Sequence, residues 1–193
     1  MAMETPPRWD RRMQQRLARG EAAALGEFYD RFASLVHSLA NRVLDDVPAA
    51  DQITREVFAH VWEHPDEYDP RHGSMRAWVA TLAQNQAVRR LRETEATAYA
   101  ETGEGSAEEL EQKVLRAKAA ARADYIVTSM PASLRAALES AYVQRRDYRQ
   151  TAADLGVTED EARRRLRLGL QLLSSANARP LEGSSPPGYG RAW

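Results

Sequence analysis

Arginines near the carboxyl end of the sequence have the types and the spacing of a nucleic-acid contact. A helix is expected over about residues 159–173. At 100° per residue, its polar side carries Asp160, Arg164, Arg167 and Gln171, flanked by Arg163 and Arg165. In a helix that enters the major groove, arginine can bond to guanine O6 and N7, and glutamine to adenine. The plainer alternative is a solvated arginine face in an arginine-rich sequence.

Three acids in the first turn of the same helix work against docking on DNA. Glu159, Asp160 and Glu161 stabilise the helix dipole by about 0.3–1 kcal/mol each. They also place negative charge at the helix N-terminus, where a phosphate would otherwise bind. We therefore expect these acids to stabilise the helix and to hinder its docking.

A second polar stripe is expected earlier in the chain. Asn85, Arg89 and Arg92 follow one another at spacings of four and three, on the helix that carries Trp78. A charged track beside a flat apolar surface suits single-stranded nucleic acid or an unstacked base. The alternative is that Trp78 belongs to the core and the arginines are solvated.

A metal site and an enzyme are two further alternatives. His60, Glu63 and His64 match the H-x-x-E-H pattern of some zinc proteases, with both imidazoles on one helical face. Short patterns of this kind often arise by chance. Trp62, which lies between the two histidines, also belongs to an apolar stripe. The sequence has no cysteine, Gly-rich phosphate loop or nucleophile elbow. We therefore expect no metal, no cofactor and no enzymatic activity.

Amphipathic helices are expected to position these groups. Apolar residues recur at spacings of three and four over 22–44, and after a break at Pro48 a second helix is expected at about 49–63. Ser74 can cap a third helix that runs over about 75–95. The predicted fold class is therefore all-α, with residues 16–95 as a first helical domain.

A linker and a tail are expected on either side of a second domain. The stretch between Thr94 and Ala107 is small, acidic and glycine-bearing, which favours a flexible linker. Ser106 and Glu109 form a capping box that opens another expected helix through Arg122, so residues 96–124 are expected to be a partly helical linker. Residues 178–193 are rich in Pro, Gly and Ser and are typical of a disordered tail.

The second domain, residues 125–177, has the order of elements of a helix-turn-helix. Asp147 with Gln150 opens a short helix that ends at Gly156, and Thr158 caps a longer one. Four residues of the longer helix share its buried face: Ala162, Leu166, Gly169 and Leu173.

Length and composition are consistent with a two-domain protein that does not enter a membrane. The 193 residues are 43% hydrophobic and 28% charged, with a mean hydropathy of -0.61 and a net charge of -1. No apolar run approaches the roughly 20 residues that span a bilayer, and the first residues do not form a signal peptide. We therefore expect a cytoplasmic protein.

Five segments together carry a resemblance to a known family. They are RLARGEAAALGEFYDRFASLVHSLANRVLDD (16–46), EVFAHVW (56–62), YDPRHGSMRAWVATLAQNQAVRRLR (68–92), MPASLRAALESAYVQ (130–144) and YRQTAADLGVTEDEARRRLRLGLQLL (148–173). In this order they resemble a bacterial RNA polymerase sigma factor of the small, two-domain extracytoplasmic-function (ECF) type.

The resemblance implies a non-catalytic specificity subunit with core RNA polymerase, promoter DNA and an anti-sigma factor as partners. Its second helix would bind the polymerase clamp through Asp51, Gln52, Arg55 and Glu56. The third helix and the loop before it would hold the minus-ten element through Asn85, Arg89 and Arg92. The last helix would dock at the minus-thirty-five element through Arg163, Arg164, Arg167 and Gln171.

Departures from the family pattern keep two alternatives open. Where the family usually has Gly-Thr-Val-Lys-Ser-Arg, this sequence has Asp-Glu-Ala-Arg-Arg-Arg at 160–165. One alternative is a sigma-like regulator that binds polymerase or an anti-sigma factor without reading promoters. The other is an ordinary helix-turn-helix repressor, which would leave the block from Trp78 to Arg92 without a use.

Overall fold

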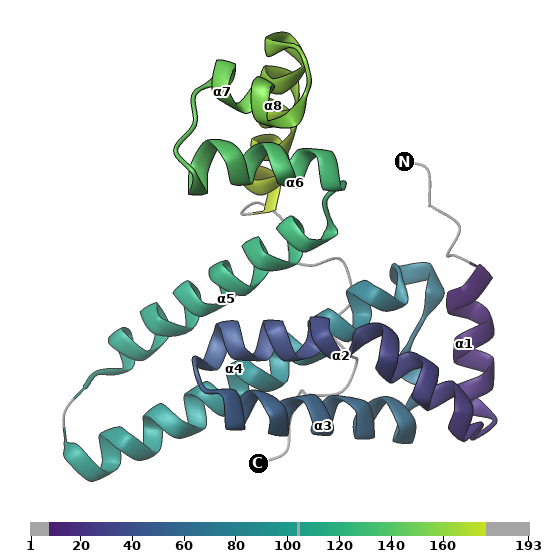
Figure 1. Ribbon diagram of the computed structural model, residues 1–193. Coiled ribbons are helices and arrows are strands. Elements are labelled where there is room, and N and C mark those ends of the chain that lie inside the picture. Colours follow the sequence, from purple (N-terminus) through teal and green to yellow (C-terminus); the bar gives the residue numbers. More distant parts are fainter. Residues whose placement is uncertain (1–7, 104, 177–193) are drawn as a thin grey trace. The chain divides into compact units, whose positions relative to one another are not determined.

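The described part of the chain is built of helices. The computed structural model describes residues 8–103 and 105–176, and within them there is no β-strand (Figure 1). The predicted all-α fold class is confirmed. The chain divides into two compact units, and the boundary falls between Ala121 and Arg122.

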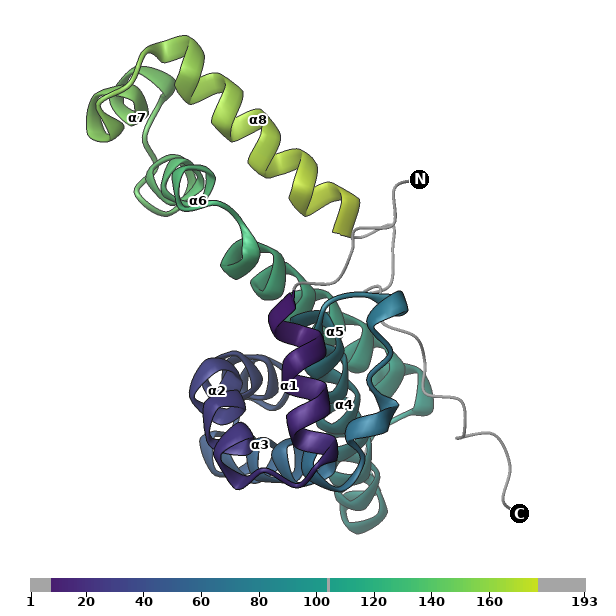
Figure 2. The same cartoon turned by 90° about the vertical axis from the view of Figure 1, so that its right-hand side faces the viewer.

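Three long helices form the core of the first unit: α2 (Ala22–Leu44), α3 (Val47–Glu63) and α4 (Met75–Thr102). They lie side by side in Figure 1 and Figure 2. Their facing residues are almost fully buried, including Phe28, Val36, Leu39, Ile53, Val57, Val61, Val79 and Ala83. The apolar residues whose spacing of three and four predicted these helices therefore lie on the faces that pack together.

Helix α3 begins at Val47, two residues before the expected start. The Asp46 side chain accepts a hydrogen bond from the Ala49 N–H at 2.9 Å and caps the helix. Pro48 lies in the first turn, where its missing N–H has no helical partner to lose. The proline that was expected to break the chain therefore starts a helix.

A first helix, α1 (Arg8–Ala18), was not expected from the sequence and lies partly outside the predicted domain of residues 16–95. Met13 and Leu17 are buried on its inner face. The Trp9 ring meets Phe32 edge to face at 5.9 Å, and the Arg31 guanidinium lies 4.4 Å from the centre of the Trp9 ring. Helix α1 therefore belongs to the packed unit.

Residues 96–124, expected to form a partly helical linker, are helical over most of their length. Helix α4 continues to Thr102, seven residues past its expected end, and α5 spans Ala107–Ser129. Alanine and glutamate are strong helix formers, so the composition that suggested a linker supports helices here. The expected capping box is present: Ser106 and Glu109 exchange hydrogen bonds of 2.9 and 3.1 Å.

The second unit packs helices around a small core. It contains the end of α5, α6 (Ala132–Leu138), a short π-helix η3 (Glu139–Val143), α7 (Tyr148–Leu155) and α8 (Glu159–Ala176). Its buried residues are Met130, Ala137, Leu138 and Leu166, surrounded by Ile126, Leu134, Ala141, Leu155 and Leu173.

Local capping fixes both ends of α7 and the start of α8, as expected. Asp147 and Gln150 form a capping box at the start of α7, and Gly156 ends it with a φ of 63°, a conformation that favours glycine. Thr158 Oγ1 accepts a hydrogen bond from the Glu161 N–H at 3.2 Å. The tail expected at 178–193 lies outside the described residues.

Candidate nucleic-acid interface

The polar stripe of α4 is on the surface of the first unit. Asn85, Arg89 and Arg92 are all exposed, so the predicted stripe faces solvent. Trp78 is half-buried, with its ring centre 5.6 Å from that of Tyr68. Trp78 thus contributes to packing and keeps part of its ring accessible, so it combines both alternatives considered from the sequence.

Acids of the same unit engage the arginines of this stripe. Arg92 Nη2 lies 3.1 Å from Glu111 Oε1 of α5, and Arg89 Nε lies 3.8 Å from Glu93 Oε1. These side chains are roughly half exposed, so solvent screens the pairs and each contributes only about 0–1 kcal/mol. A phosphate can therefore compete for either arginine.

The four residues assigned to polymerase binding form one surface of α3. Asp51, Gln52 and Arg55 are exposed and Glu56 is half-buried. The Gln52 side chain donates to Glu56 Oε1 at 2.9 Å. Asp51 Oδ1 lies 3.1 Å from Nε2 of His37 on α2.

Arg90 joins this surface to α4, a role that the sequence did not reveal. Its guanidinium donates to Gln52 Oε1 at 3.2 Å and to Glu56 Oε1 at 3.1 Å. Arg90 is 38 residues from Gln52 in sequence, so helical periodicity alone could not have predicted the contact. It links the predicted polymerase surface to the helix that carries the predicted DNA stripe.

A buried hydrogen-bond cluster fixes the loop that precedes α4. Asp10 of α1 accepts a hydrogen bond from the Met75 N–H at 2.9 Å, and its Oδ2 lies 3.3 Å from the Tyr68 hydroxyl. That hydroxyl also lies 3.0 Å from the Gly73 carbonyl oxygen. Burial raises the pKa of Tyr68 well above its usual value, with the Asp10 charge adding to the effect. The loop is thus anchored at both ends.

Two short 3-10 helices form the body of that loop, η1 (Pro65–Glu67) and η2 (Pro70–His72). Asp69 caps η2 by accepting from the Arg71 N–H at 2.9 Å, and the Arg71 guanidinium also bonds to its carboxylate. These bonds lower the pKa of Asp69 to about 2. Asp69 therefore stays ionised at any physiological pH.

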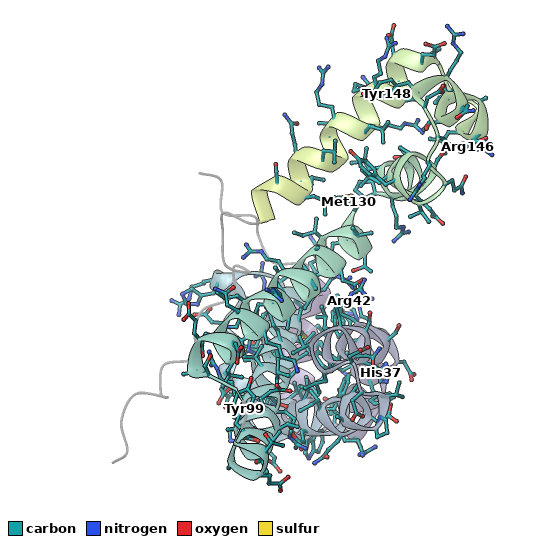
Figure 3. All side chains as sticks on the ribbon, turned by 90° about the vertical axis from the view of Figure 1, so that its left-hand side faces the viewer. His37, Arg42, Tyr99, Met130, Arg146 and Tyr148 are labelled. Carbon is teal, nitrogen blue, oxygen red and sulfur yellow. The ribbon has the colours of Figure 1, made fainter. Side chains whose placement is uncertain are left out.

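The arginines expected to meet DNA lie on the outer side of α8. Arg163, Arg164, Arg167 and Gln171 are exposed, while Ala162 and Leu166 are buried on the opposite side. The predicted division of this helix into two faces thus agrees with the structure. The guanidinium of Arg163 also lies 5.4 Å from the centre of the Tyr148 ring of α7, which Figure 3 labels.

Acids of the first turn pair with most of these arginines. Arg164 bonds to Glu161 Oε2, and Arg165 Nε lies 2.7 Å from Glu161 Oε1. Arg163 lies 3.4 Å from Asp160 and 3.7 Å from Glu159.

These pairs lower the charge that α8 offers to DNA. The bond from Arg165 lowers the pKa of Glu161, so this acid stays charged at neutral pH. Within the described residues Arg167 forms no ion pair.

Three potential metal ligands come together at the end of α3. His60, His64 and Glu67 each offer a ligand atom, and the three atoms lie within 4.8 Å of one another. The H-x-x-E-H pattern had pointed to Glu63, which does not belong to this group. The sequence pattern did not include Glu67, because this residue lies in η1 and comes close to His60 only where the chain bends after α3.

A family model matches part of the first unit. Residues 28–97, which include all of α3 and most of α4, match the model for sigma-70 region 2. This segment resembles a sigma-70 region 2 domain. It contains both the predicted polymerase surface and the predicted α4 stripe.

Curated proteins similar to this chain include ECF RNA polymerase sigma factors. The chain is 37% identical over 93 residues to SigK of Mycobacterium ulcerans (strain Agy99), a match covering 48% of this chain and 50% of that one. It is 38% identical over 93 residues to SigK of Mycobacterium tuberculosis (strain ATCC 25177 / H37Ra), covering 47% and 50%. The match thus spans about half the length of these relatives.

Solved structures show a weaker similarity over more of the chain. One is CnrH in complex with the cytosolic domain of CnrY, with 18% identity, coverage of 88% and 97%, and a TM-score of 0.38. The other is the RsbN-BldN complex, with 16% identity, coverage of 84% and 97%, and a TM-score of 0.36. Among the described helices, none is long and apolar enough to cross a membrane.

Proposed function

We propose that this chain is an RNA polymerase sigma factor of the ECF type that directs promoter-specific transcription initiation. The observation that carries the proposal is the sigma-70 region 2 match over residues 28–97. The catalytic chemistry would belong to the polymerase, and the chain would act as a specificity subunit in the bacterial cytoplasm.

The first unit would bind polymerase and the minus-ten element. In this proposal the exposed side of α3 around Asp51, Gln52 and Arg55 contacts the clamp of the polymerase. The α4 stripe and the loop before it hold the unpaired strand, because exposed arginines track phosphates and the accessible part of Trp78 offers a stacking surface. The bonds of Arg90 to α3 support a fixed spacing between the two surfaces.

The second unit would read the minus-thirty-five element through α8. Exposed arginines and Gln171 on one side of a helix have the chemistry for base edges and phosphates in a major groove. This assignment rests on the sequence resemblance and on the exposure of these side chains.

A transcription assay tests the proposal. The full chain is mixed with core polymerase and genomic DNA, and transcript start sites are mapped. We expect new start sites that share a pair of upstream elements, absent when the chain is left out. Polymerase binding without any new start site would contradict the proposal.

A residue variant tests the role of α8. Arg164→Ala should weaken use of the minus-thirty-five element by about 1–3 kcal/mol, because it removes the proposed base or phosphate contact. Polymerase binding should stay unchanged, because the Glu161 partner of Arg164 lies on the same helix and α8 is not assigned to polymerase. Equal loss of polymerase binding and promoter use would contradict the role given to Arg164.

The ion pairs of α8 favour a second candidate function. A sigma-like regulator would keep the fold and bind polymerase or an anti-sigma factor without reading promoters. Glu161 engages both Arg164 and Arg165, which reduces the charge available to DNA. The same transcription assay separates the two candidates, because only the sigma factor produces new start sites. The anti-sigma partner implied by the family resemblance is part of both proposals.

A further inference from the structure

We propose that His60, His64 and Glu67 form a binding site for a borderline divalent cation such as Zn²⁺. The site lies at the carboxyl end of α3 and in η1. It uses none of the residues assigned to polymerase or to DNA, so it stands independently of the proposed function.

The two imidazoles are adjacent on one side of α3. His60 and His64 are four residues apart, and their ring centres lie 4.6 Å from each other with 23° between the planes. His60 is half-buried and His64 is exposed. Two histidines at this spacing present nitrogen ligands to the same point in space, as in zinc-binding helices.

Glu67 completes the group from the following turn. Its Oε2 lies 2.7 Å from Nε2 of His60. A carboxylate held this close to an imidazole supplies an oxygen ligand and negative charge at the point where a cation would be bound. Imidazole nitrogen with carboxylate oxygen is a ligand set suited to Zn²⁺ and its neighbours in the first transition row.

The distances are close to those that a shared ion requires. Zn²⁺ binds nitrogen and oxygen at about 2.0–2.2 Å, so two ligands of one ion are at most about 4.4 Å apart. The three ligand atoms lie within 4.8 Å of one another without any rearrangement. Small rotations of the exposed His64 and Glu67 side chains are enough to bring them into range.

The backbone holds the three residues near this geometry. The His64 N–H donates to the His60 carbonyl at 2.8 Å, and the Glu67 N–H donates to the His64 carbonyl at 3.2 Å. Pro65 between them fixes one backbone angle at the bend. Little backbone conformational entropy therefore remains to be lost when a cation binds. Three protein ligands leave a fourth position for water.

Calorimetric titration of the full chain with ZnCl₂ tests the site. The chain carries no affinity tag and is first stripped with a chelator. We expect saturable binding of one ion per chain. His64→Gln and Glu67→Gln should each weaken binding by at least about tenfold, because even outer-shell partners of a metal site are worth about 10- to 100-fold in affinity.

Two matched variants separate this site from its alternatives. Glu63→Gln removes the acid of the sequence pattern, and His72→Gln removes a histidine outside the group; both should leave zinc affinity unchanged. Circular dichroism establishes that each exposed substitution leaves the fold intact. The proposal is overturned if the wild-type chain shows no saturable binding, if His64→Gln and Glu67→Gln bind as tightly as wild type, or if Glu63→Gln is the variant that loses binding.

Discussion

Asp10 is the residue on which the loop before α4 depends most. It is 6% exposed, and its Oδ2 accepts the Met75 N–H and lies beside the Tyr68 hydroxyl. A buried carboxylate is stable only when such donors surround it. Through this side chain, α1 contacts the first residue of α4, next to the Ser74 cap.

Replacing Asp10 should destabilise the first unit. Asp10→Ala leaves the Met75 N–H without its acceptor, and an unsatisfied buried polar group costs about 1–3 kcal/mol. The free energy of unfolding, measured with urea, should fall by that amount. Asp66→Ala removes an exposed carboxylate nearby and should change it little. Equal effects of the two substitutions would show that the Asp10 bonds contribute nothing.

Tyr68 should make the unfolding free energy sensitive to alkaline pH. Its pKa is raised in the folded chain by burial, whereas an unfolded tyrosine ionises near pH 10. Because the folded-state pKa is the higher one, the contribution is fully present below about pH 10 and is lost as pH rises further. Urea titrations should show a steeper decline above pH 10 for wild type than for Tyr68→Phe. Parallel curves would contradict this assignment.

At the scale of elements, α8 combines a side proposed to face DNA with acids that pair with its arginines. Glu161 bonds to Arg164 and Arg165, and all three lie within two turns of one helix. The affinity of this helix for a duplex therefore depends on a competition between internal carboxylates and phosphates.

Removing the Glu161 charge should strengthen duplex binding. Glu161→Gln frees two arginines and removes a negative charge from the helix N-terminus. The dependence of log K on log salt should steepen by about one unit for each additional phosphate contact. Fluorescence anisotropy with a labelled duplex measures both quantities. Glu139→Gln removes one charge elsewhere in the same unit; an equal gain from it would mean that net charge alone is responsible.

Two helical glycines should respond differently to alanine. Gly26 on α2 has nothing within 4 Å of an added Cβ, so Gly26→Ala should raise the unfolding free energy by about 0.5–1 kcal/mol. At Gly169 on α8 the added Cβ would lie 2.9 Å from Leu138 Cδ1, so contact with α6 offsets that gain. Urea denaturation should show the larger increase for Gly26→Ala; equal increases would contradict the close packing of α6 and α8.

The sequence predicted correctly those features that depend on neighbouring residues alone, such as helical periodicity and helix caps. Helix α2 has the expected bounds, and the caps at Ser74, Ser106 and Asp147 are present because capping depends only on residues three apart. Helix α1 was missed because it is short and mostly polar; the spacing of four between Trp9, Met13 and Leu17 was its one signal.

Contacts of the candidate site were predictable only in part. The exposed side of α8 follows from helical periodicity. The bonds of Arg90 to α3 and of Arg92 to Glu111 join residues far apart in sequence, so only the packed structure reveals them. Glu67 meets His60 for the same reason, through a bend whose geometry no periodic pattern describes.

At the scale of the whole molecule, charge is nearly balanced. The net charge is -1, and acids pair with most arginines on both candidate DNA surfaces. Unlike a protein that coats nucleic acid, this chain has no net excess of positive charge. Specific binding would therefore require polymerase to place both units on the promoter together.

The free chain should bind random duplex DNA weakly and lose that binding as salt rises. Few phosphates are neutralised, so few counterions are released, and the slope of log K against log salt should be shallow. Anisotropy titrations over a range of salt concentrations measure this slope. Tight binding that persists at high salt would contradict the charge balance described here.

Helix α1 has a practical consequence for dividing this protein into fragments. The stretch that matches sigma-70 region 2 starts at Phe28, which leaves out Trp9, Asp10 and Met13. A recombinant piece trimmed to that stretch would uncover Phe32 and Tyr68 to water and invite aggregation. Soluble expression of the amino-terminal body should therefore require a starting point upstream of Arg8.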